Sequence, residues 1–380
     1  MIGYKNNDVS QISNKGRCDK LLILVATLLA VCGTIMVFSA GYAYAEAKYD
    51  DPLYFAKRQL LWLLIGFVGM FIGSRIKSSF IRGATPIAYL ITVVLLILTL
   101  IIGFVGNGAQ RWISIGPLTI QPSEIAKLTM VMMLALYFYH NEERACIQRS
   151  GAVSLIHGTL IPIGIMLVPI ILVMLQRHLS CIIILGLIGI VLILLAGINM
   201  KYILGFGCVG ALSITAFALF TDYTKDRITV WLDPEAYKLT GGWQTLQGLM
   251  AIGSGGLFGK GLGLGELKYC YVSEPANDMI FAILCEELGF VGALATLVLF
   301  GLLVWRCFRI GMKADNSFDR LLCLGISIQI AIQVLLNVAV VTNTIPNTGI
   351  SLPFFSYGGS SLIMLMFEVG IVLSISRGQG

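Results

Sequence analysis

Charged residues are scarce in this chain, and their scarcity excludes most soluble classes of protein. Asp, Glu, Lys and Arg together make up 12% of the 380 residues, whereas 57% of the residues are hydrophobic. An ordinary soluble domain has about 25% charged residues. The mean hydropathy of +0.88 points the same way. We therefore interpret the chain as a polytopic membrane protein.

Histidine is also rare, and the cysteines lack the spacing of a metal site. The chain has three His and nine Cys, with no C-x-x-C pair and no Cys/His cluster. Neither a zinc site nor a disulfide framework is expected. The formal charge of +6 comes from basic residues scattered in short loops. Such residues are typical topology signals, so we expect a membrane rather than nucleic acid as the partner surface.

Long apolar runs make up most of the chain. A membrane span needs about 20 mostly apolar residues. By this measure the sequence predicts ten spans, at 21–44, 58–74, 85–105, 124–140, 154–175, 179–198, 201–221, 278–304, 321–342 and 352–375. We expect an all-α fold in which residues 1–20 form a cytoplasmic tail and residues 21–377 form one ten-helix membrane domain.

The distribution of Lys and Arg predicts the orientation of these spans. An even number of spans places both termini on one side, and basic residues gather before the first span and after the second, fourth and eighth. These segments are therefore expected to be cytoplasmic. Three external segments, 106–123, 222–277 and 343–360, hold most of the Gly, Pro and Asn punctuation. The external loop 222–277, between the seventh and eighth spans, is far longer than a connection requires and is expected to be functional.

The eighth predicted span carries three acids, which a lipid-facing helix would not tolerate. Asp278 stands at its external mouth, and Glu286 and Glu287 lie further in. At about 100° per residue, no single helix face holds all three. A carboxylate that faces lipid costs on the order of 3 kcal/mol, so we expect this span to be central in the bundle. Asp278 either caps the helix or takes part in function, and the two glutamates either bond to neighbouring helices or are functional.

The external stretch "GNGAQRWISIGPLTIQPSEIAKL", residues 106–128, supplies candidate cations. Arg111 stands in a predicted Gly-bounded turn, while Glu124 and Lys127 are spaced i, i+3 at the start of a helix. A salt bridge within one turn is one interpretation of that pair. The other is that Arg111 and Lys127 form a cationic site suited to a phosphate group.

Two more external stretches complete the set of unusual segments. "GSGGLFGKGLGLGELKYCYVSEPAND", residues 253–278, is rich in glycine, but it fails the phosphate-loop pattern because Ser254 and Gly261 stand at the wrong positions. "NTIPNTGISLPFFSYGGSS", residues 343–361, reads as a re-entrant turn. Irregular backbone at membrane depth survives only inside protein or beside a cavity. All of these segments are expected on one face of the membrane.

Glycosyl transfer from a lipid-linked sugar diphosphate fits this set of residues. When a sugar hydroxyl attacks the anomeric carbon, one carboxylate serves as general base and cations offset the charge of the departing pyrophosphate. The reaction does not need the acid that protonates the leaving oxygen in a glycoside hydrolase. We expect Asp278 to be the base, with Arg111 and Lys127 as the cations.

Between residues 20 and 377 the chain contains, in order, "NGAQRWISIGPLTIQPSEIAKL", "AIGSGGLFGKGLG", "SEPANDMIFAILCEELGFVGA", "NTGISLPFFSYGGSS" and "GIVLSISR". These stretches closely resemble the SEDS proteins (shape, elongation, division and sporulation), the family of FtsW, RodA and SpoVE. The resemblance implies a ten-helix glycosyltransferase that polymerises lipid II into peptidoglycan at the outer face of the bacterial cytoplasmic membrane. It also implies a class B penicillin-binding protein as partner.

The resemblance implies roles for particular residues. The essential aspartate of the family matches Asp278, and the charged pair of its fourth helix matches Glu124 and Lys127. Further substrate-binding candidates are Glu274, Ser356 and Gly358. A divalent cation such as Mg²⁺ or Mn²⁺ is a candidate cofactor, because phosphate leaving groups often recruit one. The stretches "SLPFFSYGGSS" and "GWQTLQGLMAIGSGGLFGKGLG" look more like the division and sporulation branch than RodA.

The chain departs from the family pattern beside the candidate base. Where the family commonly reads Leu-Pro-Glu-x-x-Thr-Asp-Phe, this chain has Ser273, Asn277 and Met279 in place of Pro, Thr and Phe. These changes leave open a specialised polymerase. Two alternatives are also open: a lipid II flippase, which would use ionisable groups near the midplane such as Glu368, and a non-enzymatic scaffold for a class B penicillin-binding protein.

Overall fold

The computed structural model describes residues 18–106, 109–115, 118–145, 155–197, 222–269 and 271–378. In chain order its helices are α1 (Lys20–Tyr49), α2 (Tyr54–Gly73), α3 (Ser78–Ile102), α4 (Pro122–Ala145), the π-helix η1 (Ile156–Leu160), α6 (Ile161–Leu175), α7 (Leu179–Leu195), α9 (Asp222–Leu232), α10 (Gly242–Ser254), α11 (Ile280–Met312), α12 (Ser317–Val341) and α13 (Gly359–Ser376). The predicted span at 201–221 and most of the predicted tail lie outside the described residues.

A small antiparallel sheet corrects the prediction that the fold is all-α. It comprises β1 (Phe104–Gly106), β2 (Ala109–Ile115) and β3 (Leu118–Ile120), in the order β1-β2-β3. Phe104 pairs with Trp112, and Ile113 pairs with Ile120. Alternating β-branched and aromatic residues suit this pleated pairing. Arg111 therefore lies in a strand rather than in the predicted turn.

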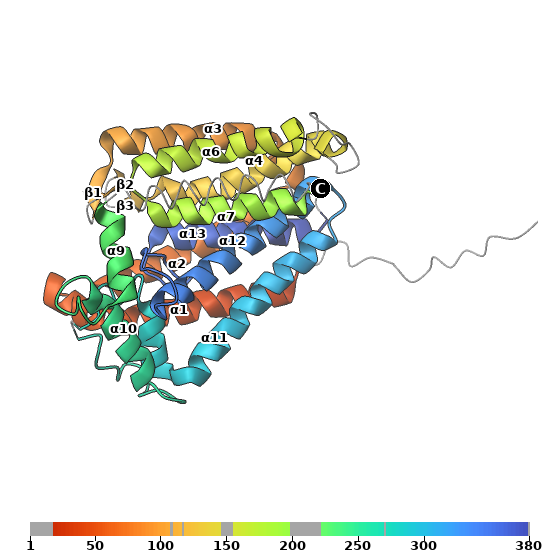
Figure 1. Cartoon of the computed structure of the whole chain (residues 1–380). Helices are drawn as coiled ribbons and strands as arrows, with labels where there is room; N and C mark the ends of the chain where they lie inside the picture. The colour runs from red at the N-terminus through yellow and green to blue at the C-terminus, as the bar shows by residue number, and fades with distance from the viewer. Residues whose placement is uncertain are drawn as a thin grey trace, which may run out of the picture.

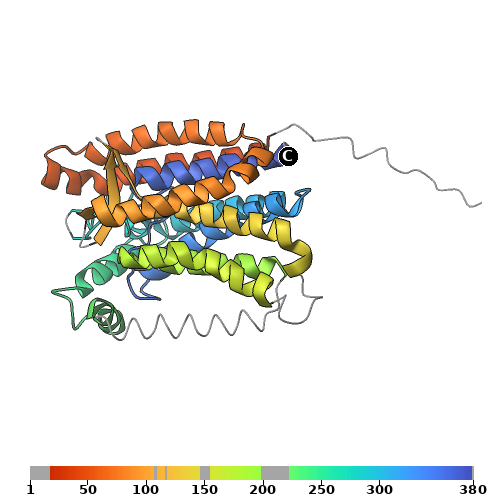
Figure 2. The same ribbon diagram turned by 90° about the horizontal axis from the view of Figure 1, so that it is seen from above.

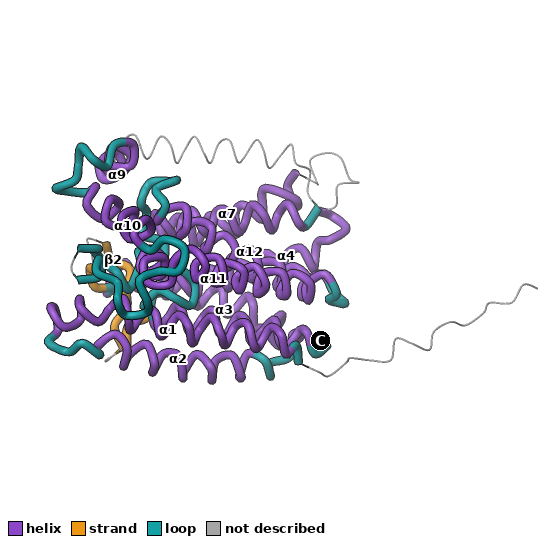
Figure 3. The backbone as a smooth tube through the Cα atoms, turned by 90° about the horizontal axis from the view of Figure 1, so that it is seen from below, coloured by secondary structure: helices purple, strands orange, loops and turns teal. Residues whose placement is uncertain are grey.

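The long helices run side by side, and the irregular elements gather at one end of the bundle. Figure 1 shows the sheet, α9 and α10 at the end opposite the C-terminus, and Figures 2 and 3 agree. Residues 343–358 join them there, because the Trp231 indole of α9 donates to the carbonyl of Asn343 (3.0 Å). We call the strands, α9, α10 and residues 343–358 the loop end.

The described helices have the length and composition of membrane spans. Seven of them are long and apolar enough to cross a membrane, and α7 is a shorter apolar helix. Leu64, Val68 and Phe71 on α2 are 57%, 57% and 60% exposed. Apolar surface on this scale is favourable only where lipid covers it. The chain is therefore a multi-pass membrane protein.

Helices α12 and α13 are more enclosed than α11, which corrects the expectation that the span after Asp278 is central. In their most apolar windows, 61% of the α12 residues and 67% of the α13 residues are buried, against 28% for α11. Helix α11 begins at Ile280 and breaks at Gly289, where φ is 67°. Protein encloses the short segment before this break, whereas much of the remaining helix faces outward.

Small residues allow α2 and α13 to approach closely. A Cβ atom on Gly73 would lie 2.8 Å from the carbonyl oxygen of Phe367, and one on Gly370 would collide with the backbone of Met70. This packing mode is common between membrane helices, where close van der Waals contact takes the place of the hydrophobic effect.

We expect Gly370→Val to destabilise the protein by about 1–3 kcal/mol, because the added side chain would force α2 and α13 apart. Thermal unfolding of detergent-purified protein would measure the loss. Gly301→Val is the matched control, because no described atom lies within 4 Å of a Cβ at Gly301. Equal melting temperatures for the two variants would contradict this account of the packing.

Candidate active site

Asp278 lies in the turn before α11, two residues ahead of the helix start at Ile280, whereas the sequence predicted it as the first residue of the span. Its backbone carbonyl accepts a hydrogen bond from Asn337 Nδ2 (3.0 Å). The same amide nitrogen donates to the carbonyl of Ile350 (2.6 Å). Asn337 is fully buried on α12, so one side chain of an enclosed helix fixes the Asp278 turn and the 343–358 segment together.

The 343–358 segment also approaches the Asp278 carboxyl directly. A Cβ on Gly349 would stand 3.0 Å from Asp278 Oδ2, and the φ of Gly349 is 73°. A positive φ and a close approach of this kind both favour glycine. The Tyr357 amide donates to the carbonyl of Ala276 (2.8 Å), which adds a second backbone attachment to the turn.

Two arginines from different elements act on the charge of Asp278. Arg111 comes from β2, where its Nη2 donates to the carbonyl of Arg177 (2.6 Å). Arg227 comes from α9, where its Nη1 donates to the carbonyl of Asn347. These bonds to backbone carbonyls hold both guanidinium groups at the loop end. Sequence reasoning found Arg111 and missed Arg227.

Burial and a neighbouring carboxylate raise the pKa of Asp278. Removal from water is the largest cause, followed by the charge of Glu274, while Arg227 and Arg111 lower the pKa; the result is about 6. At neutral pH the carboxyl is therefore mostly ionised, and it is more basic than an ordinary aspartate. A pKa near the working pH suits a general base.

His178 lies in the same region but does not suit that role. Burial, together with the charges of Arg111 and Lys127, lowers the pKa of His178 to about 3. Its imidazole is neutral at physiological pH and only weakly basic.

Glu124 and Lys127 form the predicted salt bridge, and they lie beneath the loop end instead of on its surface. Lys127 Nζ is 2.8 Å from Glu124 Oε2 and 3.2 Å from Gln333 Oε1. Lys127 is 1% exposed and Glu124 is 7% exposed. Arg111 and Lys127 therefore do not form a joint cationic surface in this structure, because the ammonium group is occupied by its buried partners.

The other candidate residues are Glu274, Ser356 and Gly358. Glu274 has a φ of 53°, and its Oε2 accepts from Asn277 Nδ2 (2.6 Å). Ser356 Oγ donates to the carbonyl of Asn277 (2.8 Å) and accepts from the Leu352 amide (2.7 Å). Gly358 directly precedes α13 in extended backbone. Ser356 thus braces the turn, and Glu274 supplies negative charge beside the base.

Glu286 and Glu287 bind the glycine-rich segment 253–268. Glu286 Oε1 pairs with Lys260 Nζ (3.0 Å) and accepts from the Glu266 amide (2.9 Å). Glu287 Oε1 pairs with Lys268 Nζ (2.7 Å), and Glu287 also accepts from the Ser39 hydroxyl. The two acids hold the glycine-rich segment against α11, and Glu287 also bonds to α1 through Ser39, so the structural interpretation applies with a loop added to the expected helices.

A divalent metal ion at this site would need ligands from a substrate as well as from the protein. Among the residues that the structure describes, no three His, Cys, Asp or Glu side chains gather as a potential metal site. Mg²⁺ is often bound by one or two carboxylates together with substrate phosphates. Asp278 and Glu274 are carboxylates that fit this arrangement.

A polar stripe on α12 was the signal that sequence reasoning overlooked. Gln329, Gln333 and Asn337 are spaced i, i+4, i+8 within an apolar span, so they share one helix face. Gln329 Nε2 donates to both carboxylate oxygens of Glu368 (2.9 Å each). The stripe therefore links Glu368, Lys127 and the Asp278 turn along one buried helix.

Comparison with known proteins assigns the chain to a family. The sequence profile of the FtsW/RodA/SpoVE family, described as "Cell cycle protein", matches residues 19–379. The chain belongs to this family, as its motifs predicted. It is 40% identical to stage V sporulation protein E of Bacillus subtilis, over 94% of this chain and 97% of that protein. It is 36% identical to a protein of Trichlorobacter lovleyi named "Probable peptidoglycan glycosyltransferase FtsW", over 95% of this chain and 93% of that one.

Solved structures are similar over nearly the whole chain. A chain from a structure described as "Structural coordination of polymerization and crosslinking by a peptidoglycan synthase complex" has a TM-score of 0.78 and 27% identity, and the match covers 95% of this chain and 98% of that one. The rod shape determining protein RodA of Thermus thermophilus has a TM-score of 0.70 and 27% identity, and the match covers 97% of this chain and 99% of RodA.

We expect Lys127→Met to destabilise the protein by about 3–5 kcal/mol, because it leaves the buried Glu124 carboxylate without its partner. The double variant Glu124→Gln/Lys127→Met removes both charges and should recover most of that loss. Thermal unfolding in detergent would compare the three proteins. A single variant as stable as the wild type would mean that the pair is not closed from solvent.

Proposed function

We propose that the chain is a peptidoglycan glycosyltransferase that polymerises lipid II, with Asp278 as general base. The observation that carries the proposal is the Asp278 carboxyl, which is fixed at the loop end, has a pKa of about 6 and lies within the influence of Arg111 and Arg227. The names of the family relatives support the same activity.

The chemistry follows from this arrangement. Asp278 takes the proton of the 4-hydroxyl of the acceptor N-acetylglucosamine. At the same time, the oxygen of that hydroxyl attacks C1 of the lipid-linked sugar at the end of the growing chain. The new C1–O bond forms as the bond from C1 to the diphosphate oxygen breaks, and the lipid diphosphate leaves with the bonding electrons. Guanidinium groups suit such a leaving group because they donate two parallel hydrogen bonds to phosphate oxygens.

We assign the diphosphate to Arg111 and Arg227 and give Lys127 a supporting role. The ammonium of Lys127 already bonds to Glu124 and Gln333. In this proposal the buried pair orients α4 and α12 beneath the site. Glu274, Ser356 and Gly358 remain proposed substrate-binding residues around the turn. A Mg²⁺ or Mn²⁺ ion held by Asp278, Glu274 and the diphosphate would offset phosphate charge.

The proposed topology has ten spans, with the seventh at 201–221 and both termini on the cytoplasmic side of the bacterial cytoplasmic membrane. The loop end, with the 222–277 segment, then faces outward. A class B penicillin-binding protein is the proposed partner, and the similarity to a chain of a peptidoglycan synthase complex supports it. The proposed setting is cell division or sporulation, given the 40% identity to the sporulation protein.

Neither rival function gains a specific observation. The carboxylates of Glu286, Glu287 and Glu368 all have protein partners, so they do not present a polar path to a transported headgroup. A pure scaffold would not need a carboxyl with a raised pKa between two arginines.

The activity itself is tested by Asp278→Asn. We expect this variant to fold normally, because Asn337 holds the backbone of Asp278 and not its side chain. Removing a general base should lower lipid II polymerisation by at least about 100-fold. Glycan ladders from labelled lipid II would measure the rate, with and without a co-expressed class B penicillin-binding protein. Asp51→Asn, which alters an exposed carboxylate paired with Lys57, is the control and should keep full activity. Wild-type ladders from Asp278→Asn would falsify the assignment.

The pH dependence of the rate is a second expectation. Protonated Asp278 cannot accept the hydroxyl proton, so the rate should rise about tenfold per pH unit below pH 6 and level off above it. Because Arg227 lowers the pKa of Asp278, Arg227→Gln should move this rise to higher pH. Arg309→Gln, at the far end of α11, should leave it in place. A rise centred near pH 4 in the wild type would indicate an ordinary exposed carboxylate.

A further inference from the structure

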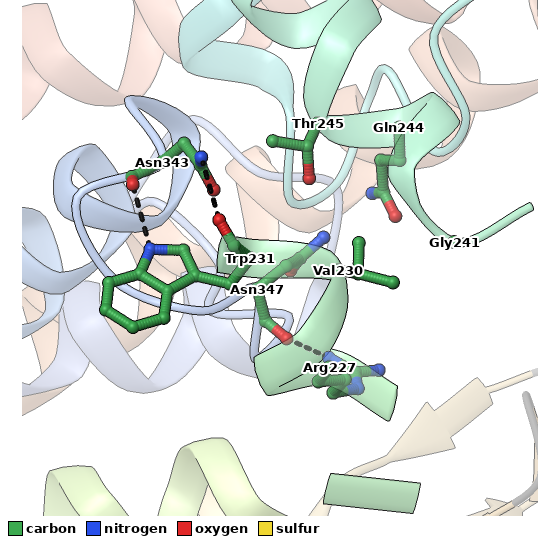
Figure 4. A pocket seen from close by; sticks show the side chains of 8 residues that line it. All are labelled: Arg227, Val230, Trp231, Gly241, Gln244, Thr245, Asn343 and Asn347. Atoms are coloured by element: carbon green, nitrogen blue, oxygen red, sulfur yellow. Dashed lines mark hydrogen bonds between the residues drawn. The ribbon is translucent and has the colours of Figure 1, made fainter. Parts of the chain in front are cut away.

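A cavity of about 200 Å³ lies between α9, α10 and the start of the 343–358 segment. In Figure 4, Gln244 and Thr245 extend from α10 on one side, and Val230 and Trp231 belong to α9 on the other. Asn347 and Arg227 also line it. None of these residues was predicted from the sequence to bind a substrate.

The polar lining of the cavity is mostly neutral, and part of it has no partner. Thr245 is 5% exposed, yet within the described part of the chain neither its hydroxyl nor the Gln244 amide makes a hydrogen bond. Asn347 Oδ1 accepts from the Gly349 amide (3.0 Å), which leaves the amide hydrogens of Asn347 for another partner. These hydrogen-bonding groups line the cavity and are available to a ligand.

The combination of groups favours an amide-bearing ligand. Carboxamide N–H groups can donate to a ligand carbonyl, and carboxamide or hydroxyl oxygens can accept from a ligand N–H. Val230 and Trp231 add apolar surface for a methyl group. An acetamido group presents a carbonyl, an N–H and a methyl in one small unit. A diphosphate would instead require a lining richer in cations, and Arg227 is the one charged residue among the described residues that line this cavity.

Two connections join the cavity to Asp278. Asn347 lines the cavity and bonds to Gly349, whose Cα faces the Asp278 carboxyl. Arg227 lines the cavity and also lowers the pKa of Asp278. Asn347 and Arg227 thus link the cavity to the surroundings of the base.

We propose that this cavity binds the 2-acetamido group of the acceptor sugar and thereby selects N-acetylated substrates. The proposal rests on the proposed function, since it assumes that Asp278 meets the acceptor hydroxyl. In the acceptor ring, C2 and C4 lie on either side of C3. A sugar with its 4-hydroxyl at Asp278 can thus place its 2-substituent in a neighbouring cavity.

The test compares two substrates in wild type, Thr245→Val and Gln244→Met. One substrate is labelled lipid II, and the other is an analogue with a hydroxyl in place of the 2-acetamido group on the sugar that carries the attacking 4-hydroxyl. We expect wild-type kcat/KM to favour the acetamido substrate by at least about 10-fold. Each variant should lower that preference by about 3- to 10-fold, because it removes one neutral hydrogen bond. Most of the change should be a lower kcat/KM for the acetamido substrate. Thr240→Val, which does not line the cavity, should change neither rate.

The outcomes separate this inference from the activity. Two outcomes would overturn the inference: glycan ladders that form equally well from both substrates, or variants that slow both substrates equally. The proposed glycosyltransferase activity would still stand in either case. If the wild type makes no ladder, the activity fails. Saturation-transfer NMR with a soluble N-acetylglucosaminyl disaccharide and its 2-hydroxy analogue then decides the inference. Binding that requires both the acetamido group and Thr245 supports the subsite, and equal binding of the two sugars contradicts it.

Discussion

The two hydrogen bonds donated by the Asn337 amide are the interaction on which the site depends. One reaches the turn that carries Asp278, and the other reaches the segment that carries Gly349. These two pieces are distant in sequence and irregular in backbone, and the Asn337 bonds add to those that Ser356 and Tyr357 make to the Asp278 turn. Asn337 is fully buried on α12, a helix whose most apolar window is 61% buried. The rigid membrane bundle thereby positions a loop-based site, as scaffolds commonly do.

The partners of each acidic residue indicate whether it has a structural role or a proposed catalytic role. Glu286 and Glu287 pair with Lys260 and Lys268 and accept from backbone amides, and they hold the glycine-rich segment 253–268 in place. Asp278 has no such close ion pair among the described residues, and its charge is balanced only by the influence of more distant arginines. Burial without a direct partner keeps a carboxylate basic. Burial without a partner makes a carboxylate unfavourable for stability, and it also makes Asp278 a suitable base.

The sequence predicted the spans well because long apolar runs are dictated by the bilayer. It also identified Asp278 and Arg111, which stand out against an apolar background. It did not predict the sheet, since its strands are short and separated by glycines that also fit a turn. The i, i+3 spacing of Glu124 and Lys127 indicated a salt bridge, but spacing cannot say how deep that pair lies. Arg227 was missed because only the folded chain brings α9 over the Asp278 turn.

The most direct test of the central claim is a structure of the Asp278→Asn protein trapped with lipid II. The account predicts that the 4-hydroxyl of the acceptor sugar lies within hydrogen-bond distance of the carboxamide that replaces the Asp278 carboxyl. It also predicts that the diphosphate of the donor meets Arg111 or Arg227. A headgroup bound instead among the buried helices near Glu368, with no sugar hydroxyl at position 278, would contradict the account and favour transport.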